Sequence, residues 1–485
     1  MRRSTTTRGE LDAIVIGSGP NGLAAALTLA RAGRSVRVYE AATTIGGGTR
    51  TEALTLPGFR HDVCSTIVPL AAASPFFRTV ELARHGAELV HPDAPVAHAL
   101  DGGRAAVLER SFTVTAAGLD SDRRSDDGSA WRRLFGPLAR DARKLSTEVL
   151  RPVIHLPRHP LALARFGLPA LRSAEGLARA RFGGEPARAL FAGLAAHSMV
   201  ALDRPLSASF GLVLGMYAHA VGWPLIRGGS GALATALASE LTALGGEIVV
   251  GDRIDSLVAL PPSRVVLFDT TPRAASAIAG DRLPDRTRRR YEAFRYGSGV
   301  FKVDWALDGP VPWTADGLRR AATIHLGGTL EEIAAAEAEV AAGRHPERPF
   351  TLFVQYHPWD PSRAPGDATT AWAYCHVPSG SEVDMTDRIE RQVERFAPGF
   401  RDRILGRAIH TPADLEAHDP NYIGGDINGG IQDVRQLLFR PTIALDPYHA
   451  GAGLYLCSSS TPPGGGVHGM SGHLAARSAL RRDLR

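Results

Sequence analysis

The clearest candidate for chemistry is a glycine motif near the N-terminus, Gly17-Ser-Gly-Pro-Asn-Gly22. It follows an apolar segment, 11–16, which is typical of a buried parallel strand, and it opens an alanine- and leucine-rich segment, 22–32, which is typical of a helix. A strand–glycine turn–helix unit places backbone N–H groups at the start of the helix, where they can bind a diphosphate. The motif therefore predicts a dinucleotide site.

An acidic residue supports this interpretation. Glu40 ends the next expected strand, 35–40, at the spacing at which dinucleotide-binding proteins place an acid on a ribose. Its charge also disfavours a ribose 2′-phosphate. From this first unit we expect the cofactor to contact Gly17, Gly19, Pro20, Asn21, Gly22 and Glu40.

A second glycine-rich loop, Ile45–Arg50, follows this acid and bears on which dinucleotide is bound. Such a loop can pass along the far side of a diphosphate, and Arg50 can add a charge-assisted contact. A simple NAD dehydrogenase has no evident use for it, so the loop favours FAD; the alternative is an ordinary surface turn. The residues expected to bind here are Gly46, Gly47, Gly48, Thr49 and Arg50.

A second match to the glycine motif, 464–469, lies close to the end of the chain. Only a terminal helix, 470–481, has room to follow it, so a second complete nucleotide-binding unit is absent there. The better interpretation is a helix N-terminus that faces the electron-rich edge of the flavin, because such a terminus stabilises negative charge. The expected contacts are Gly465, Gly466 and Val467.

Two residues are candidates for catalysis. His468 lies in the loop expected to face the flavin, where it could act as an acid or base; the alternative is a histidine that only binds backbone. Lys302 lies on an alternating segment, 299–306, on the same face as Asp304. Lys144 and Lys302 are the only lysines among 55 basic residues, so a retained ammonium indicates either a buried pair with Asp304 or an amine near flavin N5. We expect His197 and Tyr217 to be structural or to line a pocket.

Cysteines and charge exclude several other functions. Cys64, Cys375 and Cys457 form no CxxC pair and no cysteine–histidine ligand spacing, which argues against a redox dithiol and a structural zinc. The net charge is +5 and the arginines are dispersed, so nucleic-acid binding is not expected. Residues 1–10 are polar and no run of 18 apolar residues occurs, so the sequence predicts a cytoplasmic protein.

The elements that must position these residues predict a discontinuous α/β domain. Patterns typical of a dinucleotide-binding domain occur again later in the chain. They predict a helix at 231–244 and strands at 247–250, 264–270 and 453–458. We expect a Rossmann-like domain made of 1–75, 226–275 and 441–485. A mixed α+β substrate domain is expected in two inserted blocks: 76–225, largely helical, and 276–440, which contains the sheet strands 299–306 and 350–356 and a helix at 384–397.

One block, 151–182, has a second interpretation. It combines aliphatic residues with arginines at regular intervals: Arg151, Arg158, Arg165, Arg172, Arg179 and Arg181. It predicts either short helices with solvated basic faces or a patch that contacts the surface of a membrane.

Together these motifs resemble the phytoene desaturase-like flavoproteins, and in particular the branch of pyridine nucleotide-disulfide oxidoreductase domain-containing protein 2. The resemblance rests on the units already described, on Arg227–Leu233, on Pro462–Gly469 and on Asn421–Asp426, which occur in the family's order. It implies non-covalent FAD and an amine oxidase/phytoene desaturase fold, and it places Arg253 and Ile254 near the adenine. It also suggests a hydrophobic substrate, by analogy of fold alone.

The main functional hypothesis is therefore an FAD-dependent oxidoreductase. A hydride would pass between flavin N5 and a hydrophobic small molecule, either unsaturated or an amine, with oxygen or a quinone as electron acceptor. The alternatives are a redox-neutral FAD-dependent isomerase and a flavoprotein scaffold without turnover. Disulfide reduction, which the branch name suggests, lacks the cysteine pair that it needs.

Overall fold

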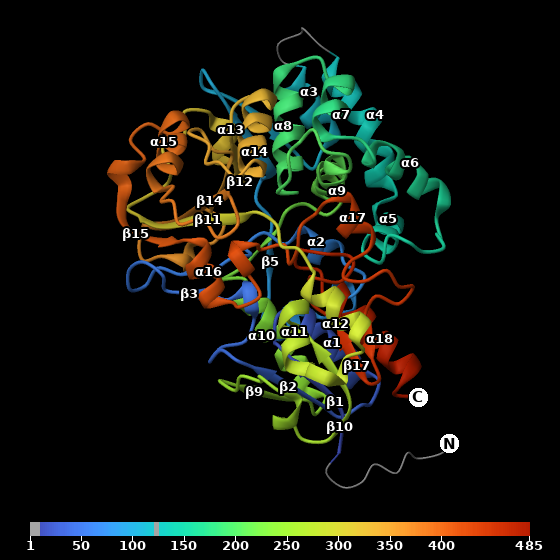
Figure 1. The fold of residues 1–485 in the computed structure, drawn as a ribbon. Coiled ribbons are helices and arrows are strands. Elements are labelled where there is room, and N and C mark those ends of the chain that lie inside the picture. Colours follow the sequence, from blue (N-terminus) through green and yellow to red (C-terminus); the bar gives the residue numbers. More distant parts are fainter. Residues whose placement is uncertain (1–9, 121–125) are drawn as a thin grey trace.

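The computed structural model describes residues 10–120 and 126–485. Its first sheet has six strands in the order β16-β17-β10-β1-β2-β9 and lies in the lower half of Figure 1. All neighbouring strands are parallel except β16 and β17, which are antiparallel. The strands are β1 (Leu11–Ile16), β2 (Val36–Glu40), β9 (Glu247–Val250), β10 (Ser263–Phe268), β16 (His449–Gly451) and β17 (Leu454–Leu456).

Helices cover both faces of this sheet. Small residues of α1 (Pro20–Arg31) and α18 (Met470–Arg482) share one core with the inner face of β1 and β2. The two helices pack so closely that a Cβ on Gly472 would lie 1.7 Å from the carbonyl oxygen of Asn21. Helix α10 (Gly231–Ala243) lies beside α1, and α11 (Pro272–Ala279) and α12 (Asp285–Glu292) cover the other face. The sheet thus draws its strands from three separate stretches of the chain.

The second sheet has seven strands in the order β15-β11-β14-β13-β12-β6-β7. Most come from the second inserted block, where the expected strands 299–306 and 350–356 appear as β11 and β13. The full set is β6 (Ala94–Leu100), β7 (Arg104–Leu108), β11 (Gly299–Leu307), β12 (Ala321–Leu326), β13 (Thr351–Gln355), β14 (Thr369–Val377) and β15 (Ile404–His410).

Two of these strands lie in block 76–225, which the sequence predicted to be largely helical. β6 and β7 form a hairpin from that block, and β6 pairs in parallel with β12, whose residues lie more than 200 positions along the chain. The sequence of β6, Ala-Pro-Val-Ala-His-Ala-Leu, is short and alanine-rich, so its strand propensity is weak. Pairing with β12 and burial of all its residues decide the conformation.

The rest of that block is a helical layer beside the second sheet, in the upper right of Figure 1. The helices surround a core that contains Trp131, Phe135 and Phe191. They are α3 (Phe112–Leu119), α4 (Asp127–Arg140), α5 (Ala142–Val149), α6 (Pro160–Ala170), α7 (Ala174–Arg181), α8 (Glu185–Ala196) and α9 (Ser207–Ala220). Within the described ranges, no helix has the length and apolar character needed to span a bilayer.

The remaining elements connect or cover these layers. Helices α14 (Leu330–Ala341) and α15 (Thr386–Phe396) pack near the second sheet, and α15 matches the helix expected at 384–397. The shorter elements are β3 (Thr51–Glu52), β4 (His61–Asp62), α2 (Pro69–Ala73), β5 (Leu89–Val90), β8 (Leu225–Ile226), α13 (Asp316–Arg319), α16 (Pro412–His418) and α17 (Val434–Leu438).

Candidate functional site

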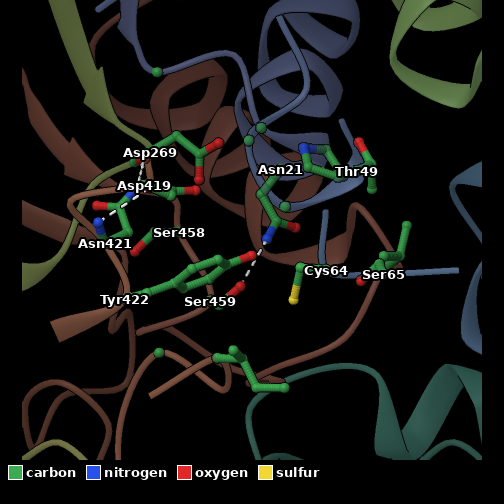
Figure 2. Close-up of a pocket in the computed structure, with 18 of the residues that line it drawn as sticks. Asn21, Thr49, Cys64, Ser65, Asp269, Asp419, Asn421, Tyr422, Ser458 and Ser459 are labelled. Carbon is green, nitrogen blue, oxygen red and sulfur yellow. Dashed lines mark hydrogen bonds between the residues drawn. The ribbon is translucent and has the colours of Figure 1, made fainter. Parts of the chain in front are cut away.

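A cavity of about 590 Å³ lies where the first sheet, the second sheet and the helical layer meet. One end is lined by the glycine motif and the carboxyl ends of β1, β2 and β10. The other end is lined by residues of the second sheet and of the helical layer. Figure 2 shows polar and apolar side chains from distant segments converging on this space. The carboxyl edge of a parallel sheet is where such folds bind their ligands.

The first glycine turn has the conformation that the motif predicts. Gly17 has φ of +102°, and a Cβ there would lie 2.7 Å from the carbonyl oxygen of Asp269. Gly22 is closer still, because its Cβ would lie 2.2 Å from the carbonyl oxygen of Gly17. A side chain at either position would collide with backbone, and at Gly17 it would also be strained. The turn therefore brings main-chain atoms of β1, α1 and β10 into direct contact.

Glu40 lines the cavity and holds this turn in place. One carboxylate oxygen accepts hydrogen bonds from the Ser18 backbone N–H at 3.0 Å and from the Ser18 hydroxyl at 2.6 Å. The other accepts from the Ala42 N–H at 2.9 Å and lies 3.5 Å from Arg50 Nη2. The acid thus connects the two glycine-rich loops, which are both predicted to bind one ligand.

The second loop, Ile45–Arg50, also reaches the cavity. The cavity is lined by Gly47, Gly48, Thr49 and Arg50. Gly46 does not line it; this glycine has φ of +117° and packs against Ala234. Arg50 is 6% exposed and donates to the carbonyl oxygen of His418 at 3.1 Å. Together with the glycine turn, this loop forms a continuous polar wall.

Two buried polar atoms of this wall are unsatisfied. Among the described residues, neither Asn21 Oδ1 nor Arg50 Nε has a hydrogen-bond partner. Buried polar groups are usually paired, so unpaired ones in a cavity wall indicate that a polar ligand completes them. A narrow glycine turn, a helix N-terminus and these two atoms fit the donor and acceptor groups of a dinucleotide.

The residues expected from outside the N-terminal unit divide into two groups. Arg253 and Ile254 line the cavity, as do Gly466 and Val467. Gly465 does not line it: a Cβ there would lie 2.8 Å from Asn428 Oδ1, so it packs against the 421–430 segment instead.

His468 corrects one expectation. It is fully buried and does not line the cavity. Its Nδ1 accepts from the Met470 backbone N–H at 3.0 Å, and its Nε2 is 3.0 Å from the Gly464 carbonyl oxygen. Burial lowers its pKa to about 4, so the ring is neutral. The histidine caps the first N–H of α18 and closes its own loop, which leaves neither ring nitrogen for the flavin or for proton transfer.

Lys302 forms the buried pair that was one of the two possibilities. Its ammonium is 2% exposed, contacts the Asp304 carboxylate and donates to the Asp62 carbonyl oxygen at 3.2 Å. Burial alone would raise the pKa of Asp304, but the Lys302 charge holds it below its ordinary value. The pair lies behind the cavity wall, with Nζ 5.2 Å from the centre of the Trp372 ring.

The end of the cavity that is lined by the glycine motif, here called the nucleotide end, also contains two acids, Asp269 and Asp419, that the sequence did not predict. Asp269 follows β10 directly and accepts a hydrogen bond from the Gly22 N–H at 2.8 Å. Burial raises its pKa to about 7, and the charges of Asp419 and Glu40 add to this. Burial likewise raises the pKa of Asp419. Figure 2 shows both acids beside Asn421, which donates to the Asp269 carbonyl oxygen at 3.4 Å. The position of Asp269, at the end of a strand next to β1, was the signal available in the sequence.

The far end of the cavity is apolar and aromatic. Thr323 of β12, Val354 of β13 and Trp372 of β14 are register neighbours, so their side chains project from one face of the second sheet. Trp372 and Tyr374 stack with centroids 5.7 Å apart and an interplanar angle of 17°. The other residues that line this end are Cys64, Ile67, Leu70, His197, Met199, Leu214, Trp223, Leu352 and Ile427.

One histidine lines this apolar end, and two buried histidines lie behind it. His197, which lines the cavity as expected, has its Nε2 3.0 Å from Nε2 of His325. Burial, with the nearby His376, lowers the pKa of His197 to about 3, so its ring is uncharged at neutral pH. His376 in turn binds both carboxylate oxygens of Glu337, at 2.8 and 2.9 Å. This arrangement presents a neutral imidazole at the cavity surface, where it can form a hydrogen bond with a ligand.

Comparison with known proteins supports the fold that the motifs predict. The model of the NAD(P)-binding Rossmann-like domain matches residues 15–80. The chain is 28% identical to rat (Rattus norvegicus) pyridine nucleotide-disulfide oxidoreductase domain-containing protein 2, over 98% of the chain and 94% of the relative. It is 25% identical to phytoene desaturase (lycopene-forming) from Pseudescherichia vulneris, over 52% of the chain and 55% of that protein.

Solved structures give the same result. An oxidoreductase from Methanosarcina mazei superposes with a TM-score of 0.63 at 15% identity, over 97% of this chain and all of that one. Putrescine oxidase bound to putrescine gives 0.61 at 17% identity, over 98% of this chain and 99% of the other. The fold is of the amine oxidase and phytoene desaturase type. The full-length relative and the partial match to phytoene desaturase are the proteins that the motifs of the chain resemble.

Proposed function

We propose that this protein is an FAD-dependent oxidoreductase that transfers a hydride between flavin N5 and a hydrophobic small molecule. The observation that carries the proposal is the continuity of the cavity. One end has the glycine turn, Glu40 and the unsatisfied atoms of Asn21 and Arg50, whereas the other has the stacked rings of Trp372 and Tyr374. A nucleotide site that opens into an apolar chamber suits a cofactor that is held at one end and reacts at the other.

The dinucleotide would be held by residues from three segments. The glycine turn and α1 would bind the diphosphate, Glu40 a ribose, and Arg253 and Ile254 the adenine. Bound in this way, FAD would supply a ring system that accepts or returns a pair of electrons with a proton. The binding requires no covalent bond, so we expect the FAD to be released by denaturation.

The chain's own residues would bind and orient the substrate. The stacked pair Trp372 and Tyr374 offers a flat apolar surface, and Ile67, Leu214 and Leu352 exclude water around it. Such a chamber suits an unsaturated or amine-containing compound without a permanent charge. His197 would form a hydrogen bond with the substrate at the wall, because its ring is neutral and is held in place by its contact with His325.

The decisive experiment begins with the absorbance spectrum of the purified protein. A flavin spectrum, followed by anaerobic bleaching when a panel of apolar alkenes and amines is added, would support the proposal. Oxygen and a soluble quinone, added separately to the bleached enzyme, would identify the class of electron acceptor. A protein that carries no flavin and cannot be reconstituted with FAD would refute the proposal.

Two alternatives predict different spectra in the same experiment. A redox-neutral isomerase would act only after the flavin is reduced, and the spectrum would be the same before and after turnover. A flavoprotein scaffold would bind FAD yet show no substrate-dependent change with any compound. The neutral His197 ring at the apolar end favours the catalytic proposals, because it can orient a substrate there through a hydrogen bond.

A further inference from the structure

The outward face of α6 (Pro160–Ala170) and the loop before it are unusually apolar. Ala162, Phe166 and Ala170 face the core, so the opposite face of the helix meets solvent. That face carries Leu161 and Leu168, which are 75% and 73% exposed. A surface helix normally presents polar residues outward, so α6 has the reverse pattern. We call the following exposed apolar residues the α6 surface: Val153, Ile154, Leu156, Leu161, Leu168 and Leu171.

Exposure of this kind is concentrated here. Leu156, in the loop before α6, is 90% exposed and Leu171, just after the helix, is 63% exposed. Scattered exposed leucines are ordinary, but contiguous ones mark a site of interaction. In Figure 1, α6 lies at the outer edge of the helical layer.

The charge around the α6 surface is almost entirely positive. Residues 151–182 contain six arginines and a single acid, Glu175. Arg158 and Arg172 are exposed, and no carboxylate of the described residues lies within ion-pair distance of either. Arg165, on the same helix face as Leu161 and Leu168, is 3.7 Å from Asp141 yet remains 60% exposed. The surface therefore combines protruding apolar side chains with unneutralised guanidinium groups.

We propose that the α6 surface docks on an anionic lipid bilayer. Apolar side chains inserted below the headgroups, with arginines at the level of lipid phosphates, are the arrangement by which a helix lies in a membrane interface. Arginine also binds phosphate oxygens in a bidentate manner, which lysine does not. The excess of positive charge favours an anionic surface over a neutral one. The protruding leucines favour a lipid layer, into which they can insert.

The position of α6 relates the surface to the cavity. Helix α6 packs on α9 (Ser207–Ala220), which contributes Leu214 to the apolar end of the cavity. A compound dissolved in the bilayer would thus be one helix layer from the proposed substrate chamber. This link to substrate supply rests on the proposed function, whereas docking itself does not.

The test is co-sedimentation of the full chain with lipid vesicles. Vesicles of equal parts phosphatidylcholine and phosphatidylglycerol are compared with vesicles of phosphatidylcholine alone. We expect binding to the anionic vesicles that weakens as salt is raised, because the arginine contribution is screened. The double variant Leu161→Gln/Leu168→Gln should bind roughly tenfold or more weakly, since it removes two large apolar groups from the contact.

A second variant separates charge from insertion. Arg158→Ser/Arg172→Ser should lose much of the preference for anionic vesicles and most of the salt dependence. The matched control, Val258→Gln/Leu405→Gln, alters two residues that are 93% and 53% exposed elsewhere on the molecule, and its binding should equal that of the unaltered protein. Retained flavin and an unchanged far-UV spectrum verify that each variant is folded.

Three outcomes would overturn the proposal. One is absence of binding to anionic vesicles, and another is equal binding by the Leu161→Gln/Leu168→Gln variant. The third is a protein that sediments as a dimer without lipid and becomes monomeric in that variant, because the surface would then bind a second copy of the chain. None of these measurements uses turnover, so a failure here leaves the proposed redox function to be judged by its own experiment.

Discussion

The two ends of the cavity are built in different ways. The nucleotide end consists mainly of backbone: glycine turns, a helix N-terminus and the carboxyl ends of three neighbouring strands. The apolar end consists of side chains, contributed by β12, β13 and β14 and by the segments at the ends of α8 and α9. The first construction depends on local conformation, whereas the second depends on packing between segments far apart in the chain.

This difference explains why the cofactor is easier to infer than the substrate. A glycine turn places the same N–H groups in any protein that contains it, so its ligand is constrained by geometry. An apolar wall constrains only the size and polarity of a ligand, and many compounds satisfy it. Variants at the two ends should therefore have distinct effects, one on binding of FAD and the other on turnover by an intact flavoprotein.

The largest effect is expected from Gly22→Ala. The added methyl would lie 2.2 Å from the Gly17 carbonyl oxygen and 2.8 Å from Asp269 Oδ2, so the turn proposed to hold the diphosphate must move. We expect purified protein without flavin, and no recovery when FAD is added. Absorbance at the flavin bands, normalised to protein, measures this.

The matched control is Gly118→Ala in α3, an exposed helix position that is not followed by proline. No atom of the described residues lies within 4 Å of the added methyl there, so flavin content should be unchanged, and stability should rise slightly because alanine favours a helix by up to about 1 kcal/mol. A Gly22→Ala protein that still carries a full complement of FAD would contradict a backbone-built nucleotide end.

Lys302→Met tests the buried pair behind the apolar end. Removal of one partner leaves the Asp304 carboxylate buried without its counter-ion, which costs about 3–5 kcal/mol of unfolding free energy. Denaturant unfolding of the apoprotein measures the loss. The double variant Lys302→Met/Asp304→Leu should recover much of the lost stability, because neither charge of the buried pair remains.

Those stability values also distinguish the two interpretations of Lys302. If the single variant is as stable as the unaltered protein while turnover falls, the ammonium acts in the reaction rather than in the fold. If both stability and turnover recover in the double variant, the pair is structural.

The sequence was most informative where conformation is local. Strand and helix periodicity located β1, α1, β2, α10 and β9 almost to the residue, because apolar runs bounded by glycine have few other structures. The hairpin of β6 and β7 was missed, since only pairing with β12 makes its weak alanine-rich sequence a strand. The sequence left two interpretations of His468 open for a related reason. A histidine in a glycine loop is equally able to face a ligand or to cap a helix, and only the packed loop decides.

His197→Gln tests the apolar end of the cavity, as Gly22→Ala tests the nucleotide end. If the neutral imidazole orients the substrate through a hydrogen bond, its loss should lower kcat by up to about tenfold, because such a bond contributes about 0.5–1.5 kcal/mol. Flavin content should be unchanged, since the residue lies far from the glycine turns. Single-turnover reduction by the best substrate found in the screen measures the rate.

The same assay can test whether His325, which lies behind His197, acts by positioning the His197 ring. His325→Gln leaves the cavity wall intact but removes the ring that contacts His197 at 3.0 Å, so the loss should be smaller and should fall mainly on kcat. An unchanged rate in His197→Gln would show that the apolar end binds substrate without a contribution from this ring.

The smallest effect is a pH dependence of FAD affinity that arises from Asp269. Burial raises the pKa of this carboxyl to about 7, and it lies at the helix N-terminus where an anionic diphosphate would bind. A bound anion favours the protonated carboxyl, so binding takes up a proton once the pH exceeds the pKa of the free protein. Affinity should therefore fall as the pH rises through 7, by at most about tenfold per pH unit.

Asp269→Asn makes this dependence testable. The amide keeps the size of the side chain but cannot ionise, so the affinity of the variant should vary little between pH 6 and about 9, within the range in which the diphosphate keeps its charge. Fluorescence quenching of FAD on binding to the apoprotein gives the affinity at each pH. An unaltered protein with a flat profile would place the diphosphate away from Asp269. A profile that rises with pH would mean that the ionised carboxylate is the form that supports the turn, through its bond to the Gly22 N–H.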